Sequence, residues 1–239
     1  MKSKFLPVLP ILAITLGASL ACSLRASNIS FDTFSATPYS WATVDTLNNL
    51  PLSMSQNNNL SLSVDSLTTL TLTGNSAIKT GTLTSGGILG TAPNYASSAQ
   101  ALYFGQSSAA GADKSAYLSV STGGSATFTF NTGQSYLGLL WGTPDSYNTL
   151  SFYNGSTLLG SMSGSPLISS YGYGYVNITT TTPFDSVVLT SSGNSFEVDN
   201  IAHSAFALAP AAPAPPMTAC LAFAGVLLLQ ALRRNQQAA

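Results

Sequence analysis

Few residues of this 239-residue chain could carry acid–base or nucleophilic chemistry. His203 is the only histidine, and the two cysteines, Cys22 and Cys220, lie near the ends. This count excludes Cys–His catalysis and histidine-rich metal sites in the body of the chain. A Ser–His–Asp triad using Asp199 is formally open, but no serine stands in a G-x-S-x-G elbow. His203 follows the last predicted strand, so we expect it to be exposed, and we predict no catalytic residue.

Two carboxyl groups outside such a triad are candidates for chemistry. Glu197 and Asp145 could form the acid pair that glycoside hydrolysis requires, if the fold brings them together. Asp145 follows Pro144 and leads into a strand, so its side chain and that of Asn148 are expected to serve a turn, with a ligand rim as the alternative. We therefore favour a structural role for both acids and predict that the protein is not an enzyme.

The segment around Glu197 also suggests a metal site. In an extended strand, Phe196 and Val198 face the core, which places Glu197 and Asp199 together on the outward face. With Asn200 beside them, these oxygen atoms could hold Ca²⁺. Glu197, Asp199 and Asn200 are the metal ligands we predict, and no other cofactor is expected.

Three tyrosines alternate with glycines and form the other candidate binding site. In an extended conformation, the rings of Tyr171, Tyr173 and Tyr175 would project from one face and could stack on sugar rings. The intervening glycines equally favour a loop whose rings pack wherever the fold leaves room. Of the two tryptophans, Trp141 ends an apolar run and is predicted to be core, whereas Trp41 could be exposed.

The elements that must position these residues are strands. Apolar residues recur at every second position through most of the body, which favours half-buried strands at 60–64, 70–72 and 126–130. A denser apolar run at 136–141 favours a central strand covered on both faces, and strands at 176–181, 187–190 and 195–201 complete the set. Asn154-Gly155 lies between two such runs and predicts a type I′ hairpin. Gly133 and Pro183 are expected to end strands, 86–113 is a predicted long loop, and Asp65-Ser66 marks either a bulge or a turn.

We predict an all-β fold, an antiparallel β-sandwich of jelly-roll type. One domain, residues 27–207, accounts for the whole body. Between Ser27 and Ala209, two lysines face eight carboxylates, a net charge of −6. Such a domain lacks the basic patch that nucleic-acid binding requires, so nucleic acid is excluded as a partner.

Both ends of the chain read as targeting segments. Residues 1–26 have two lysines and then an apolar run, the pattern of a secretory signal peptide; cleavage after Ala26 is favoured over Ala21, and lipidation at Cys22 is a minor alternative. A linker at 208–216, containing Pro213, Pro215 and Pro216, precedes a hydrophobic segment at 217–239. Its apolar run is short for a permanent span, and Arg233 and Arg234 should keep its end on the cytoplasmic side.

Together these features carry a resemblance to a known family. Residues 140–155, LWGTPDSYNTLSFYNG, and residues 192–202, SGNSFEVDNIA, resemble motifs of bacterial surface proteins sorted by exosortase. The tail is similar to the PEP-CTERM sorting signal of that family, with Pro213, Pro215, Pro216, Arg233 and Arg234 at the matching positions, although the glutamate of Pro-Glu-Pro is absent.

The resemblance implies an exported, non-enzymatic surface or extracellular-matrix protein that an exosortase-like enzyme processes near the prolines. Its C-terminal helix would hold it transiently in the inner membrane, and extracellular polysaccharide is a candidate partner. Without processing, the domain would stay anchored outside the membrane. The alternative function is a carbohydrate-binding module of jelly-roll fold at the cell surface.

Overall fold

The computed structural model describes residues 29–32, 37–55, 58–82, 89–106, 112–165 and 174–205. The signal peptide, the linker and the hydrophobic tail predicted at 1–26, 208–216 and 217–239 lie outside this part of the chain. Among the described residues, no helix has the length and apolar character needed to cross a membrane.

The described chain is mainly antiparallel β-structure, as its alternating pattern predicts. The elements in chain order are β1 (Ile29–Asp32), β2 (Thr43–Asp45), β3 (Ser53–Met54), β4 (Leu60–Ser63), β5 (Thr68–Thr73), β6 (Ser76–Lys79), α1 (Ser98–Tyr103), β7 (Tyr117–Val120), β8 (Ser125–Trp141), β9 (Asn148–Asn154), β10 (Thr157–Ser163), β11 (Gly174–Ser191) and β12 (Phe196–Ser204). They form one open sheet whose main path runs β10-β9-β11-β8-β12-β7-β6-β3. β1 joins β11, β2 joins β12, and β4 joins β5, which itself pairs with β8.

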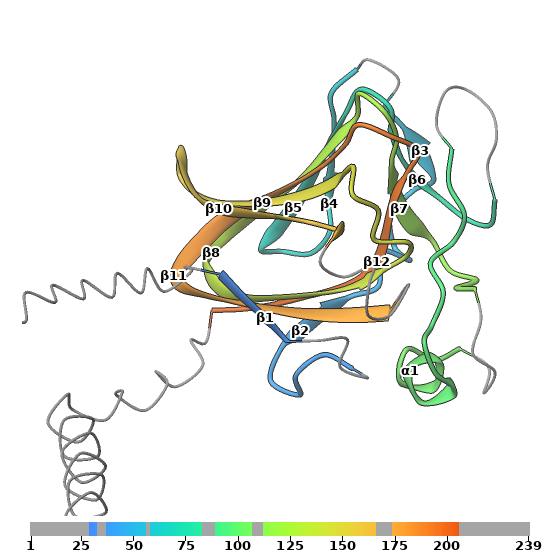
Figure 1. The fold of residues 1–239 in the computed structure, drawn as a ribbon, viewed down its shortest axis with the longest axis horizontal. Coiled ribbons are helices and arrows are strands. Elements are labelled where there is room, and N and C mark those ends of the chain that lie inside the picture. Colours follow the sequence, from blue (N-terminus) through green and yellow to red (C-terminus); the bar gives the residue numbers. More distant parts are fainter. Residues whose placement is uncertain are drawn as a thin grey trace, which may run out of the picture.

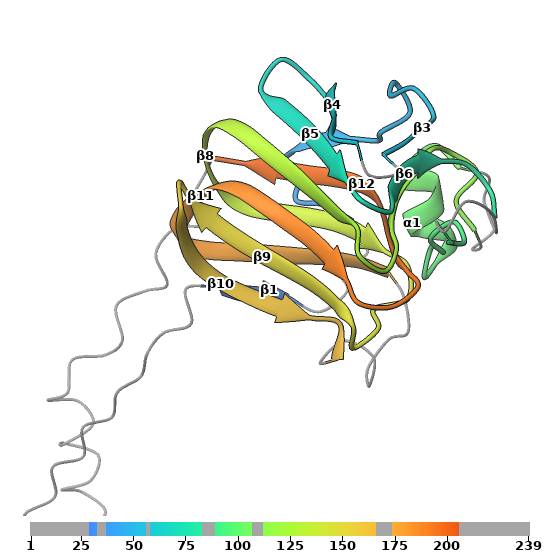
Figure 2. The same ribbon diagram turned by 90° about the horizontal axis from the view of Figure 1, so that it is seen from above.

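Two long strands, β8 and β11, fold this sheet over its own core. Residues 125–130 of β8 pair with β5 and with the second half of β11, which also pairs with β9. Residues 136–141 of β8 pair with the first half of β11 and with β12. Because both strands curve between these halves, the β10-β9-β5-β4 part of the sheet faces the β1-β12-β2 part (Figure 1). Figure 2 shows the same strands from above.

The predicted ends of strands at Gly133 and Pro183 are wrong, because both residues lie inside the long strands. The pairing of β11 with β8 shifts register between Thr179 and Phe184, so Pro183 sits where the ladder is already interrupted and its missing N–H costs no regular pairing. A side chain at Gly133 would approach the Cβ of Pro183 to 3.1 Å. The glycine and the proline therefore mark a shared bend.

The core lies between the facing halves and consists of the alternating apolar residues of both. Leu70 and Phe128 come from one half, and Leu139 and Val176 from the other. The ring of Phe184 lies 5.1 Å from Phe152, in an edge contact that aromatic pairs favour. Burial of such side chains contributes about 1.5–3 kcal/mol each, which must hold the fold in the absence of a disulfide in the described part.

The chain reverses in a turn at both places where the sequence suggests it, after Asn154 and between the strands at 60–64 and 70–72. β9 and β10 form a hairpin with Thr157 opposite Asn154, so Gly155 and Ser156 are the central residues. Only Gly155 of these two has a positive φ, +56°, which is the pattern of a type II′ turn and corrects the predicted type I′. Residues 64–67 connect β4 to β5 as a turn, which decides between the two alternatives for this segment.

The predicted long loop at 86–113 contains structure that covers the outer face of β8, β11 and β12. Its α1 helix begins after Ser97, whose Oγ accepts a hydrogen bond from Gln100 N at 3.2 Å. Phe104, just after the helix, stacks between Tyr95 and Tyr175 at centroid distances of 5.9 and 5.4 Å. A second, smaller core, to which Ala101 of α1 contributes, therefore lies outside the sheet. Figure 1 shows where α1 lies.

Candidate functional site

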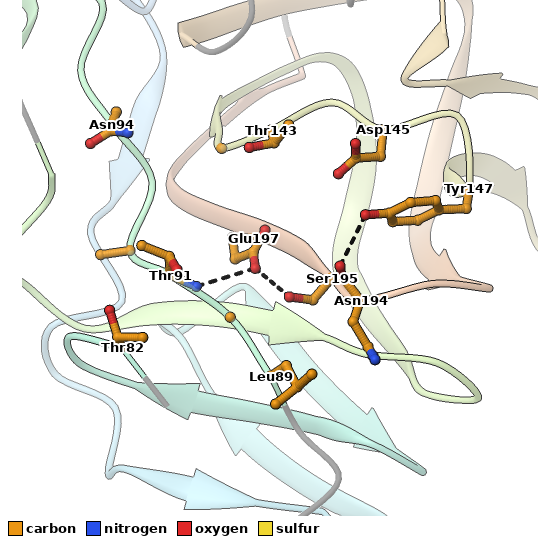
Figure 3. A pocket seen from close by; sticks show the side chains of 13 residues that line it. Thr82, Leu89, Thr91, Asn94, Thr143, Asp145, Tyr147, Asn194, Ser195 and Glu197 are labelled. Carbon is orange, nitrogen blue, oxygen red and sulfur yellow. Dashed lines mark hydrogen bonds between the residues drawn. The ribbon is translucent and has the colours of Figure 1, made fainter. Parts of the chain in front are cut away.

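The two motifs singled out in the sequence meet at one cleft. The turn after β8 supplies Gly142 to Tyr147, and the entry to β12 supplies Asn194 to Glu197. A third wall comes from the strand-like segment before α1. The cleft encloses about 460 Å³ and is open to solvent (Figure 3). It is lined by Thr82, Leu89, Gly90, Thr91, Ala92, Asn94, Gly142, Thr143, Asp145, Tyr147, Asn194, Ser195 and Glu197.

The turn between β8 and β9 is held by Asn148, as predicted for this motif. The backbone N–H of Asn148 donates to Asp145 O at 3.1 Å, and its side-chain Nδ2 donates to Thr143 O at 3.2 Å and Ser195 O at 3.3 Å. Asn148 is fully buried, so these bonds satisfy a side chain that has lost its water. They also join the turn to the β12 entry, which fixes two walls of the cleft relative to each other.

Tyr147 forms the side of the cleft nearest the β11–β12 loop. Its hydroxyl donates to Asn194 O at 2.9 Å, and a Cβ at Gly193 would lie 2.7 Å from its ring. Partial burial, and then the neighbouring carboxylate of Asp145, raise the pKa of Tyr147 to about 12. The half-buried ring therefore stays neutral and presents an apolar edge beside a carboxylate.

Glu197 forms the floor of the cleft and is only 7% exposed. Its Oε1 accepts hydrogen bonds from Ser195 Oγ and from the backbone N–H of Thr91, the latter at 3.3 Å (Figure 3). A side chain at Gly90 would meet Glu197 Oε1 and Lys79 Nζ, both at 2.9 Å. The segment 89–91 can lie on Glu197 only because residue 90 has no side chain.

Burial acts on both charges below the cleft. It raises the pKa of Glu197, although the Ser195 and Thr91 hydrogen bonds and nearby Lys79 oppose the rise. Burial also lowers the pKa of Lys79 to about 8, against the attraction of Glu197. Within the part of the chain that the structure describes, Lys79 Nζ has no hydrogen-bond partner, and it lies 5.7 Å from the centre of the Tyr117 ring. The floor is thus a weakly solvated pair of opposite charges.

Asp199 belongs to a separate buried cluster and not to the cleft. Asp113 Oδ2 accepts from the Tyr95 hydroxyl at 2.7 Å, and Oδ1 accepts from the backbone N–H of Ser115 at 2.8 Å. Asn200 donates to the Tyr95 oxygen at 3.0 Å. Burial, followed by the adjacent carboxyl of Asp113, raises the pKa of Asp199 well above its usual value.

The pKa of Asp113 shifts in the opposite direction to that of Asp199. Burial alone would raise its pKa, but hydrogen bonds from Asp199, Ser115 and Tyr95 outweigh burial and leave the pKa below its usual value. The pKa values of the two carboxyl groups are therefore pushed apart, which favours Asp199 as the acid and Asp113 as the carboxylate.

The predicted calcium ligands are consequently divided by the fold. Phe196 and Val198 face the core as expected, but the opposite face is covered, so the expected exposure of Glu197 and Asp199 is wrong. Glu197 points to the cleft, whereas Asp199 and Asn200 pack with Asp113. The sequence predicts that Glu197 and Asp199 share one face of the strand, but it does not predict the segment that covers this face.

The structure describes one of the three candidate tyrosines. Tyr175 is fully buried and its hydroxyl donates to Asn200 O at 3.0 Å, which matches the packed alternative. Tyr171 and Tyr173 lie outside the described residues, as do Pro213, Pro215, Pro216, Arg233 and Arg234.

Both tryptophans and the histidine can be placed. Trp141 is buried as predicted, and Trp41 is 38% exposed. His203 is 3% exposed, so its expected exposure is wrong. It lies within β12, where β2 and β8 flank the strand.

The cleft also contains residues that the sequence analysis did not select. Thr91 and Asn94 come from the predicted loop, and no periodic or motif signal marks them. Asp145 and Glu197, the suggested carboxyl pair, do line the same cleft (Figure 3). Comparison with known proteins found no matching family model, no matching curated protein and no matching solved structure.

Proposed function

We propose that this protein is an exported, non-enzymatic surface or matrix protein whose β-domain, of jelly-roll sandwich type, binds a glycan in the cleft between Asp145 and Glu197. One observation carries the proposal: two sequence motifs some fifty residues apart converge on one open, polar cleft. Elsewhere on the surface, polar residues alternate along single strands, and that pattern alone would not bring two separate motifs together.

The chemistry of the lining favours a neutral polyhydroxylated ligand. Carboxylate oxygens at Asp145 and side-chain amides at Asn94 and Asn194 accept or donate to hydroxyl groups, and the ring edge of Tyr147 offers apolar contact to the carbon face of a sugar. Among the described residues, no lysine or arginine lines the cleft, because Lys79 lies beneath its surface, and the two carboxyl groups of the lining oppose an acidic ligand. A neutral polysaccharide segment satisfies these conditions.

Binding is favoured over hydrolysis because of what Glu197 already does. Its Oε1 accepts two hydrogen bonds that hold the 89–91 segment against β12, and the side chain is almost fully buried. A general acid must reach the glycosidic oxygen, and a base or nucleophile must reach water or the sugar carbon. In this role Glu197 shapes the cleft floor while Asp145 at the rim contacts the ligand.

Affinity electrophoresis or calorimetry with neutral and acidic polysaccharides tests the binding role. We expect Asp145→Asn and Tyr147→Ala to weaken binding at least about tenfold, which corresponds to 1.4 kcal/mol. Tyr153→Ala, a partly exposed tyrosine in β9 outside the cleft, is the matched control. Equal binding by all three variants would remove the cleft as the site. Turnover of a glycoside that Glu197→Gln abolishes would replace binding with hydrolysis.

Export and sorting are part of the same proposal and rest on the chain ends. An exosortase-like enzyme would cleave near Pro213 to Pro216 after transient insertion of the tail in the inner membrane, releasing the domain to the cell surface or matrix. Mass spectrometry of the mature protein from its host should find a C-terminus near this linker. An intact Ala239 on membrane-held protein would instead make the tail an anchor. Replacing Arg233 and Arg234 with glutamate should release unprocessed protein.

A further inference from the structure

A second cluster of metal-binding side chains lies away from the cleft, around the buried His203. Its Nε2 is 3.4 Å from Asp45 Oδ2 and 3.7 Å from Asp65 Oδ2. One donor atom from each residue lies within 4.8 Å of the other two. Three parts of the chain meet here: β12 carries His203, β2 carries Asp45, and the β4–β5 turn carries Asp65.

The imidazole is oriented by a hydrogen bond on its far side. Nδ1 of His203 lies 3.0 Å from Gln134 Oε1, and the Gln134 amide is fixed in turn because its Nε2 donates to Thr132 O at 2.8 Å. With the glutamine oxygen facing Nδ1, that nitrogen carries the proton. Nε2 is then directed toward the two carboxylates. This outer hydrogen bond is the usual device that sets the tautomer of a metal-binding histidine.

The carboxylates are oriented too, and one oxygen is left without a donor. Asp65 Oδ1 accepts from the backbone N–H of Leu67 at 2.7 Å, which leaves Oδ2 for the histidine side. Asp45 Oδ2 is inaccessible to solvent and has no hydrogen-bond partner among the described residues, since the approach of His203 is an ion-pair contact only. A buried carboxylate oxygen with no donor is costly unless a cation neutralises it. The hydroxyl oxygen of Thr68 also lies near the ring, with Oγ1 at 3.4 Å from Nε2 of His203.

Charge and spacing favour a small divalent metal ion. Within the described part of the chain, Asp45 and Asp65 form ion pairs with His203 alone. With a neutral imidazole, the cluster therefore carries a net charge of −2. Zinc bonds of about 2.0–2.2 Å place tetrahedral ligands about 3.3–3.6 Å apart, close to the 3.4 and 3.7 Å found. Ca²⁺ prefers oxygen ligands alone and longer bonds, so an imidazole ligand disfavours it.

We propose that Asp45, Asp65 and His203 form a divalent transition-metal site of the zinc type, with one open position for water. A small cavity of about 80 Å³ beside Asp45 and Val64, and the partial exposure of Asp65, give access from solvent. The ion ties the β4–β5 turn to β2 and β12. It is independent of the cleft and of the proposed glycan binding.

The test uses Co²⁺ and Zn²⁺ with the full-length protein, purified in mild detergent and stripped with EDTA. We expect one equivalent of Co²⁺ to bind with the visible absorption of a tetrahedral site, and Zn²⁺ to displace it. Zn²⁺ should also raise the melting temperature, because an ion that binds only the folded state stabilises it by mass action. No Co²⁺ absorption and no thermal shift with either ion would overturn the proposal.

Variants locate the ion. Asp65→Asn, at a partly exposed position, should lower Zn²⁺ affinity by about 100-fold or more, and Gln134→Ala by about 10–100-fold through loss of ligand orientation. Asp145→Asn and Asp199→Asn are the matched controls, in the cleft and in the Asp113 cluster. Unchanged affinity in Asp65→Asn, or a loss confined to a control variant, would place the ion elsewhere and refute this site.

Discussion

The opposite pKa shifts of Asp113 and Asp199 predict that two chemically similar substitutions have very different costs. In Asp199→Asn, the amide Nδ2 replaces the carboxylic acid as donor to Asp113, and the amide oxygen takes the position of the carboxyl oxygen that lies 3.2 Å from Ser115 Oγ. The expected loss of stability is below about 1 kcal/mol, since Asp113 keeps a donor at this position.

Asp113→Asn removes the acceptor on which the cluster depends. Asp113 accepts from Tyr95 at 2.7 Å and from Ser115 N at 2.8 Å, and an amide can offer an oxygen to only one of these sides. A buried donor and the proton of Asp199 then lose their charged acceptor. Losing two bonds to a charged group, at about 1.5–3 kcal/mol each, predicts a loss of about 3–6 kcal/mol.

Urea unfolding at neutral pH, followed by fluorescence of the buried Trp141, measures both variants. Equal losses, or a larger loss for Asp199→Asn than for Asp113→Asn, would refute the assignment of acid and carboxylate. pH adds an independent check. A raised folded pKa means that the contribution of Asp199 is present below its unfolded pKa and is lost as pH rises through the folded pKa. The stability advantage of wild type over Asp199→Asn should therefore fall with increasing pH, and a pH-independent difference would show that Asp199 holds no proton.

Three further outcomes follow from the packing of single residues. Gly193→Ala should displace the ring of Tyr147, 2.7 Å from the added Cβ, and weaken ligand binding in the cleft while circular dichroism stays unchanged; unaltered affinity would show that the ring does not contact ligand. Lys79 has a pKa lowered to about 8, so its contribution to stability is present above the unfolded value of 10.5 and is lost as pH falls through about 8. Lys79→Met should abolish this rise in stability at alkaline pH in denaturation curves, and persistence of the rise would assign it to another group. Trp141→Ala should cost about 3–5 kcal/mol of unfolding free energy, and the exposed Trp41→Ala distinctly less, so similar losses would contradict the core position of Trp141.

Local residue patterns were sufficient for strands such as those at 126–130 and 196–198, and for which of their faces pack on the core. Alternation at 126–130 and 196–198 sets the direction of each side chain because successive residues of a strand point to opposite faces. Phe196 and Val198 are buried accordingly, and the glycine at 155 permits the hairpin that the sequence predicts. The extent of β8 and β11 was not predictable in this way, because a glycine or proline ends a strand only where no register shift accommodates it.

Only the tertiary structure determines whether the polar face of β12 is exposed or covered. Alternation places Glu197 and Asp199 opposite the core, but it cannot tell whether water or another segment covers them. Here the 89–106 segment, which has no periodic signal, covers that face. It separates Glu197 in the cleft from Asp199 beside Asp113.

The same limit applies to the cluster of Asp45, Asp65 and His203. These residues are spread over almost 160 positions of the chain, and only the pairing of β2 with β12 and the position of the β4–β5 turn bring their side chains together. A strand's own sequence sets the direction of its side chains. The neighbours that those side chains meet depend on strand order and register, which are properties of the whole sheet.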